Sequence, residues 1–163
     1  MTEPRAELRD LYLTHAPRVR RVLARLVPPS EIDDTVQEVF LRIHRFQQDY
    51  RGESAWSTWI YRITINCAQD VHRRQRWRRW LSFGLEDIDP IDPTSTTSDP
   101  SGDIQKALDS LTFAERTVVT LFYWEEASLE EISQLLEIPL GTVKSRLSQA
   151  RKKLKLLITQ EAL

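Results

Sequence analysis

The 163-residue chain is poor in cysteine, glycine and long apolar runs, and each shortage excludes a class of protein. Its single cysteine, Cys67, rules out an intramolecular disulfide and a zinc site built from clustered cysteines, and it suits a reducing compartment. No apolar run approaches the roughly 18 residues of a membrane span, and the N-terminus lacks the apolar core of a signal peptide. We therefore expect a cytoplasmic protein without membrane insertion. Only four glycines and few alternating β-branched runs argue against sheets.

The sequence also lacks the residue groupings of common catalytic and metal sites. Its three histidines, His15, His44 and His72, are far apart, and no two of them have the i, i+4 spacing of a helical metal pair. It contains no glycine-rich phosphate loop and no nucleophile elbow. We therefore predict that the protein is not an enzyme, with no catalytic residue, no metal, no cofactor and no small-molecule substrate.

A net charge of −1 conceals an uneven distribution of charge along the chain. Residues 1–80 hold 15 Lys and Arg against 10 Asp and Glu, whereas residues 81–110 hold one against seven. Within that acidic stretch, residues 84–103 contain three prolines, two glycines and no periodic pattern, which is typical of a flexible linker. The sequence thus predicts an all-α protein of two small helical domains, residues 1–83 and 104–163, joined by this flexible acidic linker.

Apolar stripes with helical spacing predict three helices in the first domain. The first covers residues 8–26, with a kink or a restart expected at Pro17, and the prolines at 28–29 end it. Ser30 is the expected N-cap of the second helix, and Gly52 and Ser54 are expected to open the third. The core stripe of the third helix consists of Trp56, Ile60, Ile63, Cys67 and Val71.

Two capping boxes mark helix starts in the second domain, Thr112 with Glu115 and Ser128 with Glu131. Asp103 is expected to cap a further short helix that precedes them. A tight turn over residues 137–141, ended by glycine, should lead into a last helix over residues 140–158.

The short capped helix, the turn and the last helix form a predicted helix-turn-helix, the motif that inserts a helix into the DNA major groove. Polar side chains that can read base edges and cations that can meet phosphates or guanine lie along the last helix. The alternative is a packing hairpin with a solvated basic face. The candidate DNA-binding residues are Thr142, Lys144, Ser145, Arg146, Ser148, Gln149, Arg151 and Lys152.

Residues 73–79 hold five arginines and one tryptophan, a combination that suits phosphate binding and stacking on bases. At about 100° per residue, one stripe of the third helix also carries two tryptophans and polar residues beside the core stripe. The alternatives are a solvated charged face, and a second hydrophobic contact covered by the tryptophans. The members of this stripe are Trp59, Asn66, Asp70, Arg73 and Trp77.

The outer face of the second helix is charged, with Leu41 as one apolar residue among the charges. Without other information, a solvated surface with i, i+4 pairs such as Glu38–Arg42 would be the preferred interpretation. Leu41 favours a partner surface instead.

Read together, these segments resemble an extracytoplasmic-function (ECF) sigma factor of the sigma-70 family. EIDDTVQEVFLRIHRF and RGESAWSTWIYRITINCAQDVHRRQR are similar to conserved region two of that family. LDSLTFAERTVVTLFYWEEASLEEISQLLEIPLGTVKSRLSQARKKL is similar to region four. The resemblance implies a factor that binds core RNA polymerase and directs it to promoters, where it melts the −10 element and reads the −35 element. It also implies an anti-sigma protein as a regulatory partner.

The resemblance also implies which residues carry each contact. The polymerase-binding residues would be Asp34, Gln37, Glu38, Leu41, Arg42 and Arg45. The −10 DNA-binding residues would be Trp56, Trp59, Arg62, Asn66, Asp70, Arg73, Arg74, Arg76 and Trp77. The last helix would read the −35 element through the eight residues named above. Two rivals are a self-standing helix-turn-helix regulator, which leaves the first domain unexplained, and an RNA-binding protein that uses the arginine run.

Overall fold

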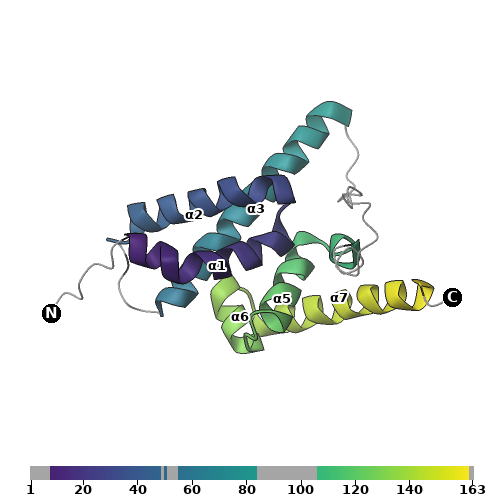
Figure 1. The fold of residues 1–163 in the computed structure, drawn as a ribbon. Helices are drawn as coiled ribbons and strands as arrows, with labels where there is room; N and C mark the ends of the chain where they lie inside the picture. The colour runs from purple at the N-terminus through teal and green to yellow at the C-terminus, as the bar shows by residue number, and fades with distance from the viewer. Residues whose placement is uncertain (1–7, 49, 51–54, 84–105, 162–163) are drawn as a thin grey trace. The chain divides into compact units, whose positions relative to one another are not determined.

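The computed structural model describes residues 8–48, 50, 55–83 and 106–161, and every regular element in these ranges is a helix (Figure 1). The all-α prediction is confirmed.

The chain divides into two compact units, Met1–Arg73 and Arg74–Leu163, and the boundary falls inside one continuous helix rather than in the predicted linker. Residues 84–103, Asp103, Gly52 and Ser54 lie outside the described residues. The helices are α1 Leu8–Leu26, η1 Pro29–Glu31, α2 Ile32–Phe46, α3 Trp56–Phe83, α5 Phe113–Tyr123, α6 Leu129–Leu136 and α7 Leu140–Glu161.

In the first unit, α1 packs along α2, and their apolar stripes form the core. Val22 and Leu23 of α1 and Val39 and Ile43 of α2 are completely buried, as the helical spacing predicted. On α3 the predicted stripe is only partly right, because Trp56 and Ile63 are half-buried, while three other residues complete the buried face. Those additional buried residues are Thr64, Ile65 and Ala68.

In the first unit, the restart at Pro17 and the N-cap at Ser30 are both absent. α1 continues through Pro17 without a restart, since Pro17 and Leu13 both lie on its exposed face, where water can satisfy the carbonyl that a proline leaves unpaired. Ser30 does not cap α2. It lies inside the 3₁₀ turn η1, which Pro29 begins with its fixed φ, and Glu31 takes the N-cap position without a side-chain bond.

In the second unit, both predicted capping boxes are present. The Thr112 hydroxyl accepts from the Glu115 N–H (3.3 Å), and the Glu115 carboxylate accepts from the Thr112 N–H (2.9 Å). Ser128 and Glu131 form the same reciprocal pair at the start of α6, at 3.1 and 2.7 Å. α5 and α6 both pack against α7 around a core that includes Val118, Leu121, Ile132, Val143 and Ala150.

The turn between α6 and α7 differs from the prediction at its glycine. Glu137, not Gly141, adopts the left-handed conformation that ends α6, with φ of 55°. α7 already begins at Leu140, so Gly141 lies in its first turn, and a Cβ there would meet open space. The Pro139 carbonyl starts the helix by accepting hydrogen bonds from the N–H groups of Thr142 (2.9 Å) and Val143 (3.2 Å).

Candidate functional site

The outer face of α2 presents the predicted polymerase-binding residues unevenly. Leu41 is 59% exposed, which is unusual for a leucine surrounded by charges. Arg42 is half-buried, because its Nε donates to Glu38 Oε1 (2.7 Å) and its Nη2 donates to Asp70 Oδ2 of α3 (2.9 Å). The bond to Glu38 and the bond to Asp70 raise the pKa of Arg42 above its ordinary value, against the lowering effect of burial. The exposed members of this face are Asp34, Gln37, Glu38, Leu41 and Arg45.

Asp70 joins two groups of residues that the sequence assigned to different sites. Its carboxylate pairs with Arg42 of α2 on one oxygen and with Arg73 of α3 on the other. Asp70 is therefore a bridge between the two helices, and its predicted contact with −10 DNA stays a prediction. Residues 42 and 70 are too far apart in sequence for a periodic pattern to have paired them.

The start of α3 carries an aromatic cluster made by Tyr50, Trp56 and Trp59. The ring centroids of Tyr50 and Trp56 are 4.1 Å apart, and Trp59 meets Trp56 edge-on at 5.3 Å. Both tryptophans are half-buried, and their assignment to the −10 DNA contacts stays a prediction. Tyr50 was missed by the sequence analysis, and no pattern there could have identified it. Further along α3, Arg62 is half-buried and Asn66 is exposed.

The arginine run occupies the later turns of α3, where Arg73, Arg74 and Arg76 are exposed. Trp77 is 59% exposed and stacks on Trp80, with ring centroids 4.9 Å apart and planes 25° from parallel. Trp80 was not among the predicted site residues, although its i, i+3 spacing from Trp77 is a signal that the sequence contained.

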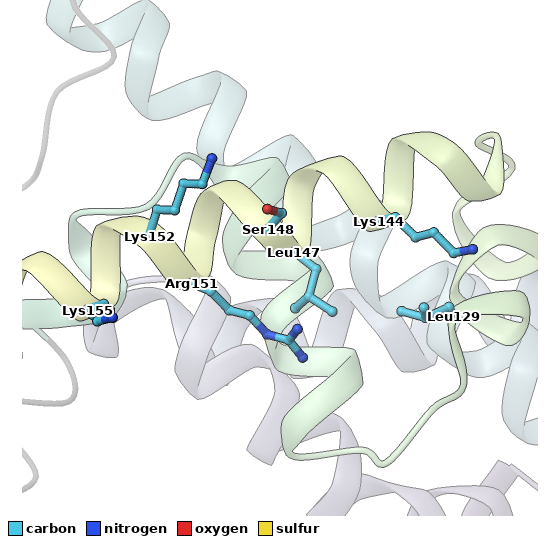
Figure 2. Close-up of a pocket in the computed structure, with 7 residues that line it drawn as sticks. All are labelled: Leu129, Lys144, Leu147, Ser148, Arg151, Lys152 and Lys155. Carbon is cyan, nitrogen blue, oxygen red and sulfur yellow. The ribbon is translucent and has the colours of Figure 1, made fainter.

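A basic pocket of about 330 Å³ lies along α7 beside the start of α6 (Figure 2). Four cationic side chains surround it, two of them predicted DNA-binding lysines, together with the predicted Ser148. Ser145 and Gln149 are exposed on the same helix, while Thr142 and Arg146 are half-buried. Leu129 and Lys155 line the pocket without having been predicted. The full lining is Leu129, Lys144, Leu147, Ser148, Arg151, Lys152 and Lys155.

Arg151 is held in place by residues at the end of α5. Its Nε donates to the hydroxyl of Tyr123 (2.8 Å), and its guanidinium lies over the rings of Phe122 and Tyr123, 5.5 and 5.7 Å from their centroids. The hydrogen bond uses Nε, and the two terminal nitrogens of a guanidinium are the pair that can bind one phosphate in a bidentate contact. Tyr123 is thus a supporting residue that the sequence analysis missed.

An ion pair between a partly exposed lysine and a buried carboxylate links α7 to α5. Lys153 Nζ lies 2.8 Å from Glu115 Oε2, and Glu115 is only 4% exposed. Burial raises the pKa of Glu115, but the bonds from Lys153 and Thr112 outweigh that effect and hold this pKa below its ordinary value. The capping box and the ion pair therefore share one carboxylate, which links the start of α5 to α7.

Two negative findings apply to the part of the chain that the structure describes. Within it, no three His, Cys, Asp or Glu side chains are grouped so that they could hold a metal ion. Also among these residues, no helix combines the length and apolar character that crossing a membrane requires.

Comparison with known proteins identifies the family. The model of sigma-70 region 2 matches residues 11–78, and the model of sigma-70, region 4 matches residues 101–154. The ECF RNA polymerase sigma-E factor of Haemophilus influenzae is 30% identical over 148 residues, which are 83% of this chain and 78% of that protein. The chain belongs to the ECF group of the sigma-70 family. The resemblance deduced from the sequence motifs is confirmed.

Other relatives of this ECF sigma factor agree. The ECF RNA polymerase sigma-E factor of Escherichia coli K12 is 29% identical over 155 residues, 87% of this chain and 81% of that protein. The sigma factor RpoE of Bartonella quintana, solved in complex with the anti-sigma factor NepR, has a TM-score of 0.74 at 24% identity, over 94% of this chain and 97% of that one. CnrH, solved with the cytosolic domain of CnrY, has a TM-score of 0.70 at 21% identity over 94% and 88%. These solved structures support the fold.

Proposed function

We propose that this ECF sigma factor binds core RNA polymerase through α2, opens the −10 element with α3 and reads the −35 element with α7. The observation that carries the proposal is the presence of both sigma-70 regions in one chain and in family order. Polymerase supplies the chemistry in this scheme, so the chain is a transcription initiation factor and not an enzyme. Its place of action is the cytoplasm, where bacterial polymerase and promoters are.

Leu41 supports the assignment of the polymerase-binding surface to α2. A leucine that is 59% exposed gains free energy when a partner covers it, and the surrounding charges can supply orientation. Asp34, Gln37 and Arg45 are exposed on the same helix and can form the rim of such a contact. Arg42 would act mainly by holding Glu38 and Asp70 in position.

The first turns of α3 have the composition of a base-capturing pocket. A base that leaves the stack costs a few kcal/mol, which aromatic contacts and hydrogen bonds to its edge can offset. The cluster of Tyr50, Trp56 and Trp59 supplies the aromatic surface, and Asn66, exposed two turns further along, supplies an amide that can donate and accept. Arg73 and Arg74 lie beyond, where their charges can meet the DNA backbone.

The surface of α7 fits duplex DNA at the −35 element. Lys144, Arg151, Lys152 and Lys155 line its pocket, where their charges can meet DNA phosphates (Figure 2). Ser148 and Gln149 have short polar groups that can contact base edges, and Gln149 can bond adenine through two atoms. Backbone and base contacts are thus available from one helix.

An anti-sigma protein is the partner that we propose for regulation. Both solved neighbours were captured with a second protein: RpoE is in complex with the anti-sigma factor NepR, and CnrH is in complex with the cytosolic domain of CnrY. A protein that covered the outer face of α2 would block polymerase binding directly, because the exposed Leu41 would no longer be available.

The test is a binding experiment between the purified full chain and sigma-free bacterial core polymerase, followed by transcription from a library of promoters. Co-elution on size exclusion and promoter-dependent transcripts are expected. A folded chain that fails to bind core polymerase would refute the proposal. Binding of duplex DNA alone would then support a self-standing regulator, and tight binding of RNA alone would support the RNA-binding interpretation.

A further inference from the structure

One carboxylate on α3 serves two arginines that belong to different surfaces. Asp70 Oδ2 accepts from Arg42 of α2 (2.9 Å), and Asp70 Oδ1 accepts from Arg73, which lies one turn further along α3. Arg42 also donates from Nε to Glu38 Oε1 (2.7 Å). Charges of alternating sign therefore run without a break from the outer face of α2 to the arginine run of α3. We call these four side chains the charged relay.

Asp70 holds its two arginines under different conditions. The Arg42 side chain is 31% exposed and has Glu38 as a second carboxylate partner, whereas the Arg73 side chain is 74% exposed. Solvent weakens an exposed ion pair more than a partly buried one. Asp70 is also the only acid among residues 56–83 of α3. The bond between Asp70 and Arg73 is therefore the one that an incoming anion displaces first.

DNA and Asp70 compete for the same guanidinium. In the proposed function Arg73 meets the DNA backbone, and a phosphate accepts hydrogen bonds from arginine as a carboxylate does. While Arg73 pairs with Asp70 the two charges cancel, so Arg73 contributes little to the attraction between α3 and the phosphates. Arg42 works in the opposite direction, because its positive charge offsets part of the negative charge by which Asp70 holds Arg73.

We propose that Asp70 is a positioning residue that sets how strongly Arg73 binds DNA, and that Arg42 of α2 acts on the same contact through Asp70. The inference rests on the proposed function. In the free chain Asp70 holds Arg73. On promoter DNA a phosphate replaces Asp70 as the partner of Arg73, and Asp70 keeps its bond to Arg42. A residue of the polymerase-binding helix thus contributes to DNA affinity without touching DNA.

The experiment measures binding of a fluorescent forked promoter DNA, in which the −10 element is single-stranded, to holoenzyme reconstituted with saturating full chain. D70N keeps the shape of the side chain but removes its charge. It should raise DNA affinity about 2- to 5-fold, the size expected for one exposed ion pair. It should also steepen the slope of log affinity against log salt by up to about one, because the charge of Arg73 is no longer cancelled.

Two controls separate the relay from a general effect of charge. D10N removes the same charge from an exposed position on α1 and should change neither the affinity nor the slope as much as D70N does. In an R73A background D70N should give no gain, because the arginine that it releases is missing.

Arg42 tests the link across the two helices without altering Asp70. R42M should lower DNA affinity about 2- to 3-fold, because Asp70 then holds Arg73 alone, and it should have no effect in a D70N background. Titration of each chain with core polymerase in the absence of DNA ensures that every variant is compared as saturated holoenzyme.

Four outcomes would overturn the inference. They are equal DNA affinity of D70N and the wild type, the same gain from D70N in the R73A background, the same loss from R42M in the D70N background, and weaker DNA binding by a folded D70N, which would make Asp70 a direct DNA contact. Thermal unfolding of each variant checks that it is folded. A wild-type holoenzyme that does not bind the forked DNA would instead refute the proposed function, so the two failures are distinguishable.

Discussion

Leu41 gives the sharpest test of the polymerase-binding surface. The substitution Leu41→Ala removes apolar surface from the outer face of α2 without breaking a bond that the structure shows. Complete burial of a leucine contributes about 1.5–3 kcal/mol. Since 59% of Leu41 is still exposed in the free chain, a partner that covers it gains about 1–2 kcal/mol. We therefore expect Leu41→Ala to weaken binding to core polymerase by about 5- to 30-fold.

The assay is titration of a fluorescently labelled chain with sigma-free core polymerase. Leu156→Ala is the matched control, because Leu156 is 65% exposed and belongs to α7 rather than to α2. Both variants should keep the wild-type free energy of unfolding within about 0.5 kcal/mol, as exposed substitutions usually do. If Leu41→Ala and Leu156→Ala bind core polymerase with the same affinity as the wild type, α2 does not dock through Leu41.

Arg42 is a poorer probe of the same surface. Its removal would release Glu38 and Asp70 together, and Asp70 also pairs with Arg73. A loss of polymerase binding in an Arg42 variant would therefore combine docking with a rearrangement between α2 and α3. Leu41 avoids this ambiguity because its side chain points away from the helix interface.

Three further predictions concern the region 4 unit. Tyr123→Phe keeps the ring but removes the hydroxyl that accepts a hydrogen bond from Arg151. Affinity for promoter DNA with a −35 element should therefore fall about 2- to 10-fold when Arg151 is present, and not at all when Tyr123→Phe is made in an R151A background. An equal loss in both backgrounds would show that Tyr123 has only a structural role. Gln149→Ala should alter base preference at one −35 position in a selection from randomised promoters, whereas a uniform loss would assign Gln149 to the backbone. Lys153 and Thr112 lower the pKa of Glu115, so ionised Glu115 should contribute to the free energy of unfolding above pH 4.5, the ordinary pKa, and this contribution should be lost as pH falls through the lowered folded-state pKa. Lys153→Met should lessen this pH dependence of the free energy of unfolding, measured by urea titration at several pH values. An unchanged pH profile would contradict the assignment.

Local sequence signals determined much of this protein. Both capping boxes were found from a spacing of three residues, because the reciprocal bonds close within one helical turn and need no other part of the chain. Apolar periodicity found the buried faces of α1 and α2 for the same reason. Local signals were wrong at Ser30, where the adjacent Pro29 began a 3₁₀ turn, and at Gly141, which lies in the first turn of α7 instead of ending the turn before it.

Tertiary structure alone decided how the functional side chains are held. Arg42 meets Asp70 across 28 residues, Arg151 meets Tyr123 across 28, and Lys153 meets Glu115 across 38. A periodic pattern reports only which side of its own helix a residue occupies, whereas each of these pairs depends on how two helices pack. The sequence by itself therefore determined the helices and the family, and it named the residues that we propose to contact polymerase and DNA. Packing decided which of them are free to do so and which hold the others in place.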